Sequence, residues 1–192
     1  MQIKNNGQAN MSRKVLGVGL VILAVGFRFL PHPSNFTPLL AIFIFSSGFF
    51  RNKWWAVLFP LSVMFISDLL VNNIMYRAYF DGFVLLYHGA VWTYIAMTAL
   101  SLLSIPLLEK FTFTRTLWSG VVASVLFYVI SNFGVWFSGA LYPKTVQGLI
   151  TCYTMALPFF KNTLISTLLF VSAMYGITYY VEKKKWIWDT EN

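Results

Sequence analysis

Charged side chains are scarce in this chain of 192 residues. Asp, Glu, Lys and Arg together make up 10% of it, whereas 58% is hydrophobic. A soluble domain carries about a quarter of its residues as charged side chains. The polar surface that is missing must therefore face lipid, and the sequence predicts a membrane protein in which one domain takes up the whole length.

Cysteine and acidic residues are also rare. Cys152 is the one cysteine, which excludes an internal disulfide and a cysteine-rich metal site. The net charge is +8, but the basic residues stand singly or in small groups between apolar runs, which argues against a nucleic-acid partner. A Ser-His-Asp set at a recognisable spacing, a glycine loop for phosphates and an H-E-x-x-H helix are absent as well. We therefore expect no enzymatic activity, no cofactor and no metal.

Long apolar runs are what the sequence does contain. A helix needs about 20 apolar residues to cross a hydrocarbon core of about 30 Å. The first run, after Arg13, lacks a small-residue cleavage site of the signal-peptide kind, so we expect it to be retained. The sequence predicts an all-α bundle of six transmembrane helices, at Val15–Leu30, Pro38–Phe50, Trp54–Val71, Phe83–Leu103, Leu117–Leu141 and Pro158–Val181.

The second of these spans is short. Thr37 as N-cap and Pro38 at the first helical position mark its start. It could lie obliquely, thin the bilayer or be re-entrant. We favour a packed, shorter crossing, because a re-entrant segment would put Arg51 and Lys53 on the side that the charge distribution disfavours.

The distribution of Lys and Arg predicts that both termini are cytoplasmic. Residues 1–14 then form a cytoplasmic segment, 15–181 the transmembrane domain and 182–192 a cytoplasmic tail. Basic residues near span ends resist translocation. The cytoplasmic side would hold Lys4, Arg13, Lys14, Arg51, Lys53, Lys110, Arg115, Lys183, Lys184 and Lys185, and the outer side only Arg28, Arg77, Lys144 and Lys161.

The outer loop before the last span has a helical pattern of its own. Apolar residues at Val146, Leu149, Ile150, Tyr153 and Leu157 recur at the spacing of one helix face. We expect a short amphipathic helix on the outer surface. It could be an interfacial connector or a lid over a pocket.

Polar side chains within the spans carry most of the functional information, because they are costly in lipid. Arg28, Asp68, His88, Asn132 and Asn162 are all expected in the outer half of the membrane. Several have companions four residues away on the same helix face, among them aromatic rings. Placed hydrogen-bonding groups within an apolar and aromatic lining are typical of a ligand pocket.

The candidate substrate-binding residues follow from this pattern. Two expectations stay open for them: Arg28 and Asp68 could form an ion pair that only fixes helix packing, and the aromatic residues could belong to the interfacial belt. The histidines could be ordinary packing residues, and Lys161 could extend to the headgroups. The set is Arg28, His32, Asn35, Asp68, Asn72, Tyr76, His88, Trp92, Asn132, Trp136, Tyr153, Lys161 and Asn162.

Three stretches also carry a resemblance. The residues from Arg28 to Pro38, Arg-Phe-Leu-Pro-His-Pro-Ser-Asn-Phe-Thr-Pro, together with Ser67-Asp68-Leu69 and Ser131-Asn132-Phe133, resemble a family of uncharacterised bacterial membrane proteins. That family is similar in size, span number and topology to the substrate-binding S components of energy-coupling-factor (ECF) vitamin transporters. The resemblance covers most of the chain, although the A-x-x-x-A motif typical of the first S-component helix is absent.

The resemblance implies an S-component-like fold in the bacterial cytoplasmic membrane and the uptake of a vitamin-like micronutrient. Arg28 or Lys161 would bind an anionic group, polar side chains would donate hydrogen bonds, and Trp92, Trp136 and Tyr153 would stack on a ring. The partners would be the lipid bilayer, the ligand and an ECF-type coupling subunit with its ATPases. The alternative is a structural or accessory subunit of a larger membrane complex, without a ligand of its own.

Overall fold

A computed structural model of the chain describes residues 3–50 and 52–190, and the side chains of 15–50 and 52–183. The described residues form helices and connecting turns, with no strand. A π-helical segment, η1 (Val71–Met75), extends α3, and a short 3-10 helix, η2 (Arg77–Tyr79), follows it. The six α-helices are α1 (Ile3–Phe27), α2 (Leu39–Phe49), α3 (Lys53–Leu70), α4 (Ala90–Leu107), α5 (Phe113–Ser138) and α6 (Val146–Thr190).

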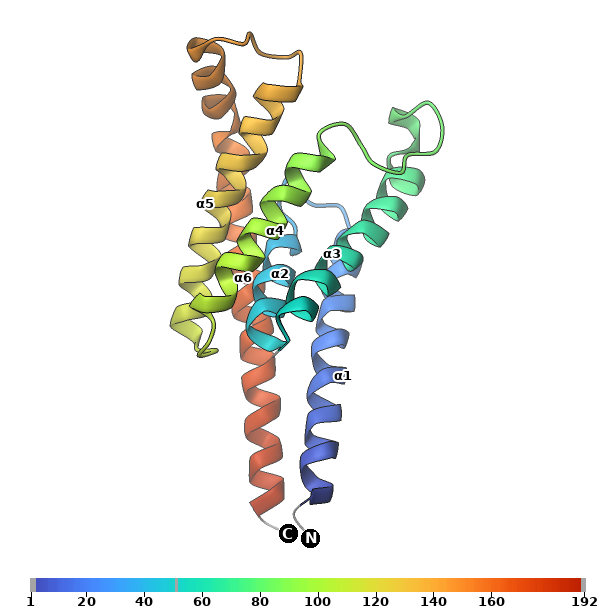
Figure 1. Cartoon of the computed structure of the whole chain (residues 1–192). Helices are drawn as coiled ribbons and strands as arrows, with labels where there is room; N and C mark the ends of the chain where they lie inside the picture. The colour runs from blue at the N-terminus through green and yellow to red at the C-terminus, as the bar shows by residue number, and fades with distance from the viewer. Residues whose placement is uncertain (1–2, 51, 191–192) are drawn as a thin grey trace.

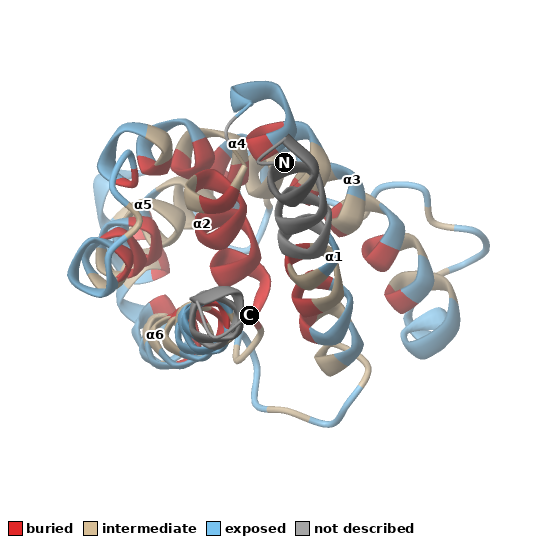
Figure 2. Cartoon of the chain, turned by 90° about the horizontal axis from the view of Figure 1, so that it is seen from below, coloured by how far each residue is buried: buried red, intermediate tan, exposed pale blue. Residues whose placement is uncertain are grey.

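The short helix α2 lies at the centre of the bundle. It is apolar on all sides, and ten of its eleven residues are buried, which is the pattern of a helix enclosed by protein. α2 contacts all five other α-helices, α1, α3, α4, α5 and α6, and seen from below the buried residues gather around it (Figure 2). Phe43 and Phe45 are its largest fully buried side chains. This helix forms the core on which the outer helices pack.

Four helical stretches are long and apolar enough to cross a membrane: Lys53–Met75, Ala90–Leu107, Phe113–Ser138 and Val146–Lys183. The apolar stretches Val15–Phe27 of α1 and Leu39–Phe49 of α2 are shorter. At 1.5 Å per residue α2 is about 16 Å long, roughly half the thickness of a hydrocarbon core. The second predicted span is therefore a short buried helix.

The last helix differs from the sequence-based expectation. Residues 146–157 are not a separate amphipathic helix on the surface but the first turns of α6, which continues through Pro158 to Thr190. The Asn162 amide donates to the Ser34 carbonyl in the link between α1 and α2. About 24 Å of α6 therefore extends beyond that link. The expected apolar face does not make the contact with α5, because Val146, Ile150 and Leu157 are exposed. The buried residues of this segment are Gly148, Cys152 and Ala156, and the Cys152 thiol bonds to the Asn132 carbonyl of α5.

The fourth predicted span also begins later than expected, at Ala90 instead of Phe83. Gly89 precedes it in the left-handed region, with φ of +83°, a conformation that suits glycine. The connection before it is tied to the π-helical segment, because the Asn73 side chain exchanges hydrogen bonds of 2.8 Å with both backbone groups of Val84. The apolar run from Phe83 thus lies in a fixed connection rather than in a helix.

The chain runs up and down along the bundle (Figure 1). α1 begins and α6 ends at the same end of the molecule, and both helices extend well beyond the α2–α3 and α4–α5 turns, which point towards that end. The link between α1 and α2 lies well below the upper ends of α5 and α6 in this view. The link between α1 and α2 therefore lies at the side of the bundle, below its upper tip, and residues 30, 31 and 33–35 of it are exposed.

Candidate functional site

The centre of the candidate site is an ion pair between the end of α1 and α3. The Arg28 guanidinium lies 2.6 Å from the Asp68 carboxylate and also donates to the Ser67 hydroxyl. Only 13% of the Arg28 side chain and 9% of the Asp68 side chain are exposed. The second carboxylate oxygen of Asp68 accepts from the Tyr94 hydroxyl of α4 at 3.4 Å. The pairing predicted as an alternative from the sequence is thus present.

A cavity of about 240 Å³ lies beside this pair. It is enclosed by the α1–α2 link, the first turn of α2, the connection before α4, and α4, α5 and α6. No side chain caps the N-terminal end of α2 that borders it. The lining residues are Arg28, Asn35, Thr37, Leu39, Leu40, Tyr87, Thr93, Met97, Phe127 and Thr163.

A second cavity, of about 190 Å³, lies between α5 and α6. It adjoins the first one, because both are lined by Asn35, Phe127 and Thr163. Asn35 has a φ of +62°, a left-handed conformation that asparagine adopts more readily than most residues. The other lining residues are Tyr128, Ser131, Asn132, Val135, Ala156, Phe159 and Phe160.

The lining offers neutral hydrogen-bonding groups. The Tyr87 hydroxyl donates to the Thr93 hydroxyl at 3.0 Å, which leaves the Thr93 proton available to an acceptor. Burial raises the pKa of Tyr87 above its usual value of 10.0, so this phenol stays protonated at neutral pH. The Asn132 amide donates to the Tyr128 carbonyl, and its own carbonyl oxygen remains an acceptor. Together with an aromatic wall from Phe127, these groups can hold a polar molecule that carries a ring.

Three of the predicted aromatic residues pack elsewhere. The Trp92 ring lies against Gly134 and Phe133 of α5, and its N–H donates to Ser138 at 2.6 Å. Trp136 donates to the Pro143 carbonyl, and the Tyr153 hydroxyl to the Val129 carbonyl. None of the three lines either cavity. They join α4 to α5 and α5 to α6.

Two predicted residues shape the α1–α2 link. The His32 ring stacks on Phe27 at 5.9 Å and bonds to the Pro33 carbonyl at 3.0 Å. The Asn162 side-chain amide of α6 donates a hydrogen bond of 2.9 Å to the Ser34 carbonyl. These contacts place Asn35 at the junction of the two cavities.

The remaining predicted residues lie away from the cavities. Tyr76 is exposed and pairs with Tyr79 beyond η1. His88 lies in the turn before α4 and is exposed, not within a span as expected. Lys161 is exposed on α6, and Asn72 is half-buried in η1. Of the predicted set, Arg28, Asn35 and Asn132 line the cavities and Asp68 lies directly behind Arg28.

Sequence reasoning missed the hydroxyl residues and Phe127. Thr37, Thr93, Thr163 and Ser131 cost little in lipid, so they do not stand out as charged residues do. A usable signal is their helical phase: Thr93 and Met97 lie four residues apart on the face of α4 that borders the cavity.

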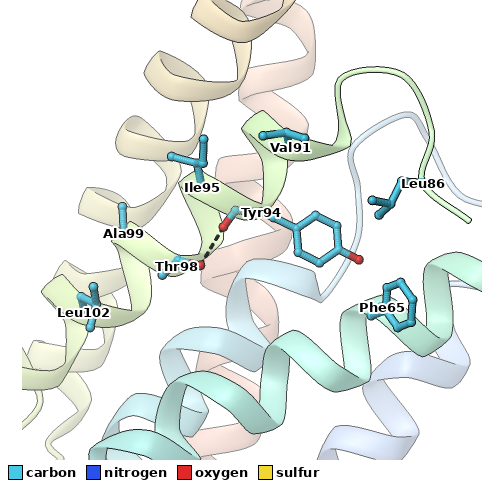
Figure 3. A pocket seen from close by; sticks show the side chains of 8 residues that line it. All are labelled: Phe65, Leu86, Val91, Tyr94, Ile95, Thr98, Ala99 and Leu102. Carbon is cyan, nitrogen blue, oxygen red and sulfur yellow. Dashed lines mark hydrogen bonds between the residues drawn. The ribbon is translucent and has the colours of Figure 1, made fainter.

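A third hollow lies on the other side of α4. It is an open groove of about 700 Å³ between α3 and α4 (Figure 3). The Tyr94 side chain extends from α4 towards Phe65 of α3, and Leu86 from the connection lies above them. The Thr98 hydroxyl donates to the Tyr94 carbonyl of its own helix at 2.8 Å. The other lining side chains are Val91, Ile95, Ala99 and Leu102, so the wall is apolar.

The fold defines an all-helical, multi-pass membrane protein whose interior contains a buried ion pair and two adjoining polar cavities. The chain belongs to the family of unknown function DUF6580, whose model matches residues 8–188. No curated protein and no solved structure matches it.

Proposed function

We propose that this protein binds a small, vitamin-like micronutrient at the outer side of the bacterial cytoplasmic membrane and serves its uptake, in the manner of a six-helix ECF S component. The observation that carries the proposal is the pair of adjoining cavities of about 240 and 190 Å³, which share the lining residues Asn35, Phe127 and Thr163. Ligand sites in proteins typically measure about 300–1,000 Å³ and combine an apolar wall with a few polar groups. Joined by a small movement at Asn35, the two cavities reach that range.

The orientation of the cavities supports an outward-facing site. The α2–α3 turn, after which Lys53 begins α3, and the α4–α5 turn, which contains Lys110, point towards the end of the molecule where α1 begins. Lys and Arg in short loops favour the cytoplasmic side. The link of residues 28–38, which covers the cavities, leaves α1 at its opposite end. A ligand would thus reach the site from outside, and a coupling subunit with ATPases would energise its release.

Thermal stability across a panel of water-soluble vitamins tests the proposal. A ligand at about 100 times its dissociation constant adds about 2.7 kcal/mol to the folded state. Thr93→Trp should abolish the shift, because Thr93 lines the cavity, whereas Thr98→Trp on the groove side of the same helix should preserve it. Equal shifts in both variants would contradict binding in the cavity.

The groove between α3 and α4 favours a second candidate, an accessory subunit of a larger complex. Its apolar lining and open side could receive a transmembrane helix of another chain. The two functions differ in what they predict for purified protein. An absence of any vitamin shift, together with a stable co-purifying membrane partner that Leu102→Trp displaces, would support the accessory role.

A further inference from the structure

The charge of the ligand can be inferred from the groups that face the cavities, and this inference rests on the proposed function. The residues that line the two cavities include one charged side chain, Arg28. All other polar lining groups are hydroxyls or amides, which are neutral at pH 7. The net charge of the site therefore depends on whether Arg28 is compensated.

Arg28 is compensated within the protein. Its guanidinium bonds to the Asp68 carboxylate at 2.6 Å and to the Ser67 hydroxyl. Asp68 lies behind Arg28 and does not itself line a cavity. A ligand carboxylate or phosphate would have to compete with Asp68 for the same guanidinium, and it would add a second anion beside the first.

No other ionic group is available to balance a charged ligand among the side chains that the structure describes near the cavities. Lys161 is exposed on α6 and lines neither cavity. Lys144 donates to the carbonyls of Trp136 and Gly139. Arg77 and Asp81 lie in the connection after η1, outside both linings.

We infer that the molecule held in this site has no net charge at neutral pH and offers hydroxyl or amide groups beside a ring. Burying an unpaired ion in a site of low dielectric is far costlier than burying a neutral group that forms hydrogen bonds. Thr93 and Asn132 supply a donor and an acceptor, and Phe127 supplies an aromatic surface. The Arg28–Asp68 pair excludes anions as well as fixing α1 to α3.

Pairs of compounds that differ only in charge test this inference. We would measure dissociation constants of the purified protein for nicotinamide and nicotinate, for pyridoxine and its 5′-phosphate, and for riboflavin and its 5′-phosphate. In the wild type, the neutral member of whichever pair binds should bind at least about tenfold more tightly, since one uncompensated charge is worth more than about 1.4 kcal/mol. This comparison needs no variant.

Two variants then test whether the Arg28–Asp68 pair causes the preference for the neutral compound. Asp68→Asn leaves Arg28 uncompensated and should shift the preference towards the anionic member, whereas Arg28→Gln with Asp68→Asn removes both charges and should restore the preference for the neutral member. If Asp68→Asn does not fold, the comparison of neutral and anionic compounds in the wild type still decides the point. Tighter binding of an anionic member by the wild type would overturn the inference and leave the proposed function standing. No binding of any of these compounds would overturn both.

Discussion

Helix α4 separates two hollows that have opposite linings and meet at one ion pair. On one side, Thr93 and Met97 face the cavity next to Arg28. On the other side, Ile95 and Leu102 face the open groove, where Tyr94 reaches Asp68. The two sides differ in what their hydroxyls do. The Thr93 hydroxyl accepts a hydrogen bond from Tyr87, so its own proton remains available as a donor. The Thr98 hydroxyl donates its proton to the Tyr94 carbonyl of its own helix.

This difference shows that the count of polar residues on a helix does not identify a binding wall. Each face of α4 contains a threonine, and the two faces differ in the hydrogen-bond partner of its hydroxyl. A hydroxyl that is bonded to its own helix backbone is not available to a polar ligand. The connection before α4 also contributes an apolar residue to the groove and a polar one to the cavity. Leu86 lines the groove, and the adjacent Tyr87 lines the cavity.

The largest expected effect comes from breaking the ion pair that the two hollows share. Asp68→Ala leaves the Arg28 guanidinium buried without a counter-charge, and we expect a loss of about 3–5 kcal/mol in the free energy of unfolding. Unfolding in SDS mixed micelles measures it.

A matched double variant controls for this change. Arg28→Met with Asp68→Leu removes both charges and fills similar volumes, so it should cost much less than the single change. A double variant as unstable as Asp68→Ala would mean that the packing of α1 on α3, and not the unpaired charge, is what the single change disrupts.

The next effect concerns the third face of α4, which contacts α5. The Trp92 ring lies where a Cβ at residue 134 would be, so Gly134→Ala should displace the ring and cost about 1–3 kcal/mol of stability. Gly176→Ala in α6 is the control, because nothing lies within 4 Å of the Cβ that it adds. It should be neutral or slightly stabilising, since alanine is the better helix former.

The same variant checks the placement of Trp92. If the ring instead faced a ligand cavity, as the sequence suggested, Gly134→Ala would leave the stability unchanged. Thermal unfolding followed by tryptophan fluorescence distinguishes the two, since a displaced Trp92 would also shift the emission spectrum.

A smaller and more local effect is expected at the connection that contributes to both hollows. Asn73→Ala removes the two hydrogen bonds to Val84 and one to the Leu69 carbonyl, and should lower the local opening free energy by about 1–2 kcal/mol. Hydrogen exchange of the Val84 amide reports it. Asn72→Ala, one residue earlier, should leave that exchange rate unchanged. A change of equal size in Asn72→Ala would argue against the hydrogen bonds between Asn73 and Val84 as the cause.

The sequence indicated the ion pair as one of two alternatives for Arg28 and Asp68, because a charged residue in an apolar run is costly enough to require a partner. Arg28 and Asp68 are such residues. The apolar helices were also predictable, because long apolar runs stand out in the sequence. The cavity wall could not be predicted in the same way, since Thr93 and Thr163 fit a lipid-facing or a buried position equally well. Their environment is decided by how α2 packs, and that helix is too short for its direction to be read from hydropathy.

Similar reasoning explains the misplaced helix boundaries. The apolar run from Phe83 has the composition of a span. It is nevertheless a connection, because Gly89 has a left-handed conformation and the Asn73 side chain is bonded to the backbone of Val84. The pattern from Val146 predicted a helix whose covered face includes Val146, Ile150 and Leu157, yet these side chains are exposed and the small residues Gly148, Cys152 and Ala156 are buried. Periodicity therefore identified the helix but not the face that packs against the protein.

The smallest expected effect concerns the phenol of Tyr87 at alkaline pH. Burial raises the pKa of Tyr87 above 10.0 in the folded protein, so the unfolded chain loses this proton first as the pH rises. The contribution of Tyr87 to stability is therefore complete below pH 10 and decreases as the pH rises towards the folded-state pKa. Tyr87→Phe lacks this decrease but loses the hydrogen bond to Thr93, which contributes about 1 kcal/mol.

The difference between the wild type and Tyr87→Phe isolates this residue from the other tyrosines. We expect the wild type to be the more stable by up to about 1 kcal/mol at pH 8, and the gap to narrow as the pH rises above 10 in chemical unfolding curves. Tyr79→Phe, at an exposed position beyond η1, should show no change in the gap. A gap for Tyr87→Phe that is constant with pH would mean that water reaches the phenol, and that the cavity is open beside Thr93 rather than closed by the connection.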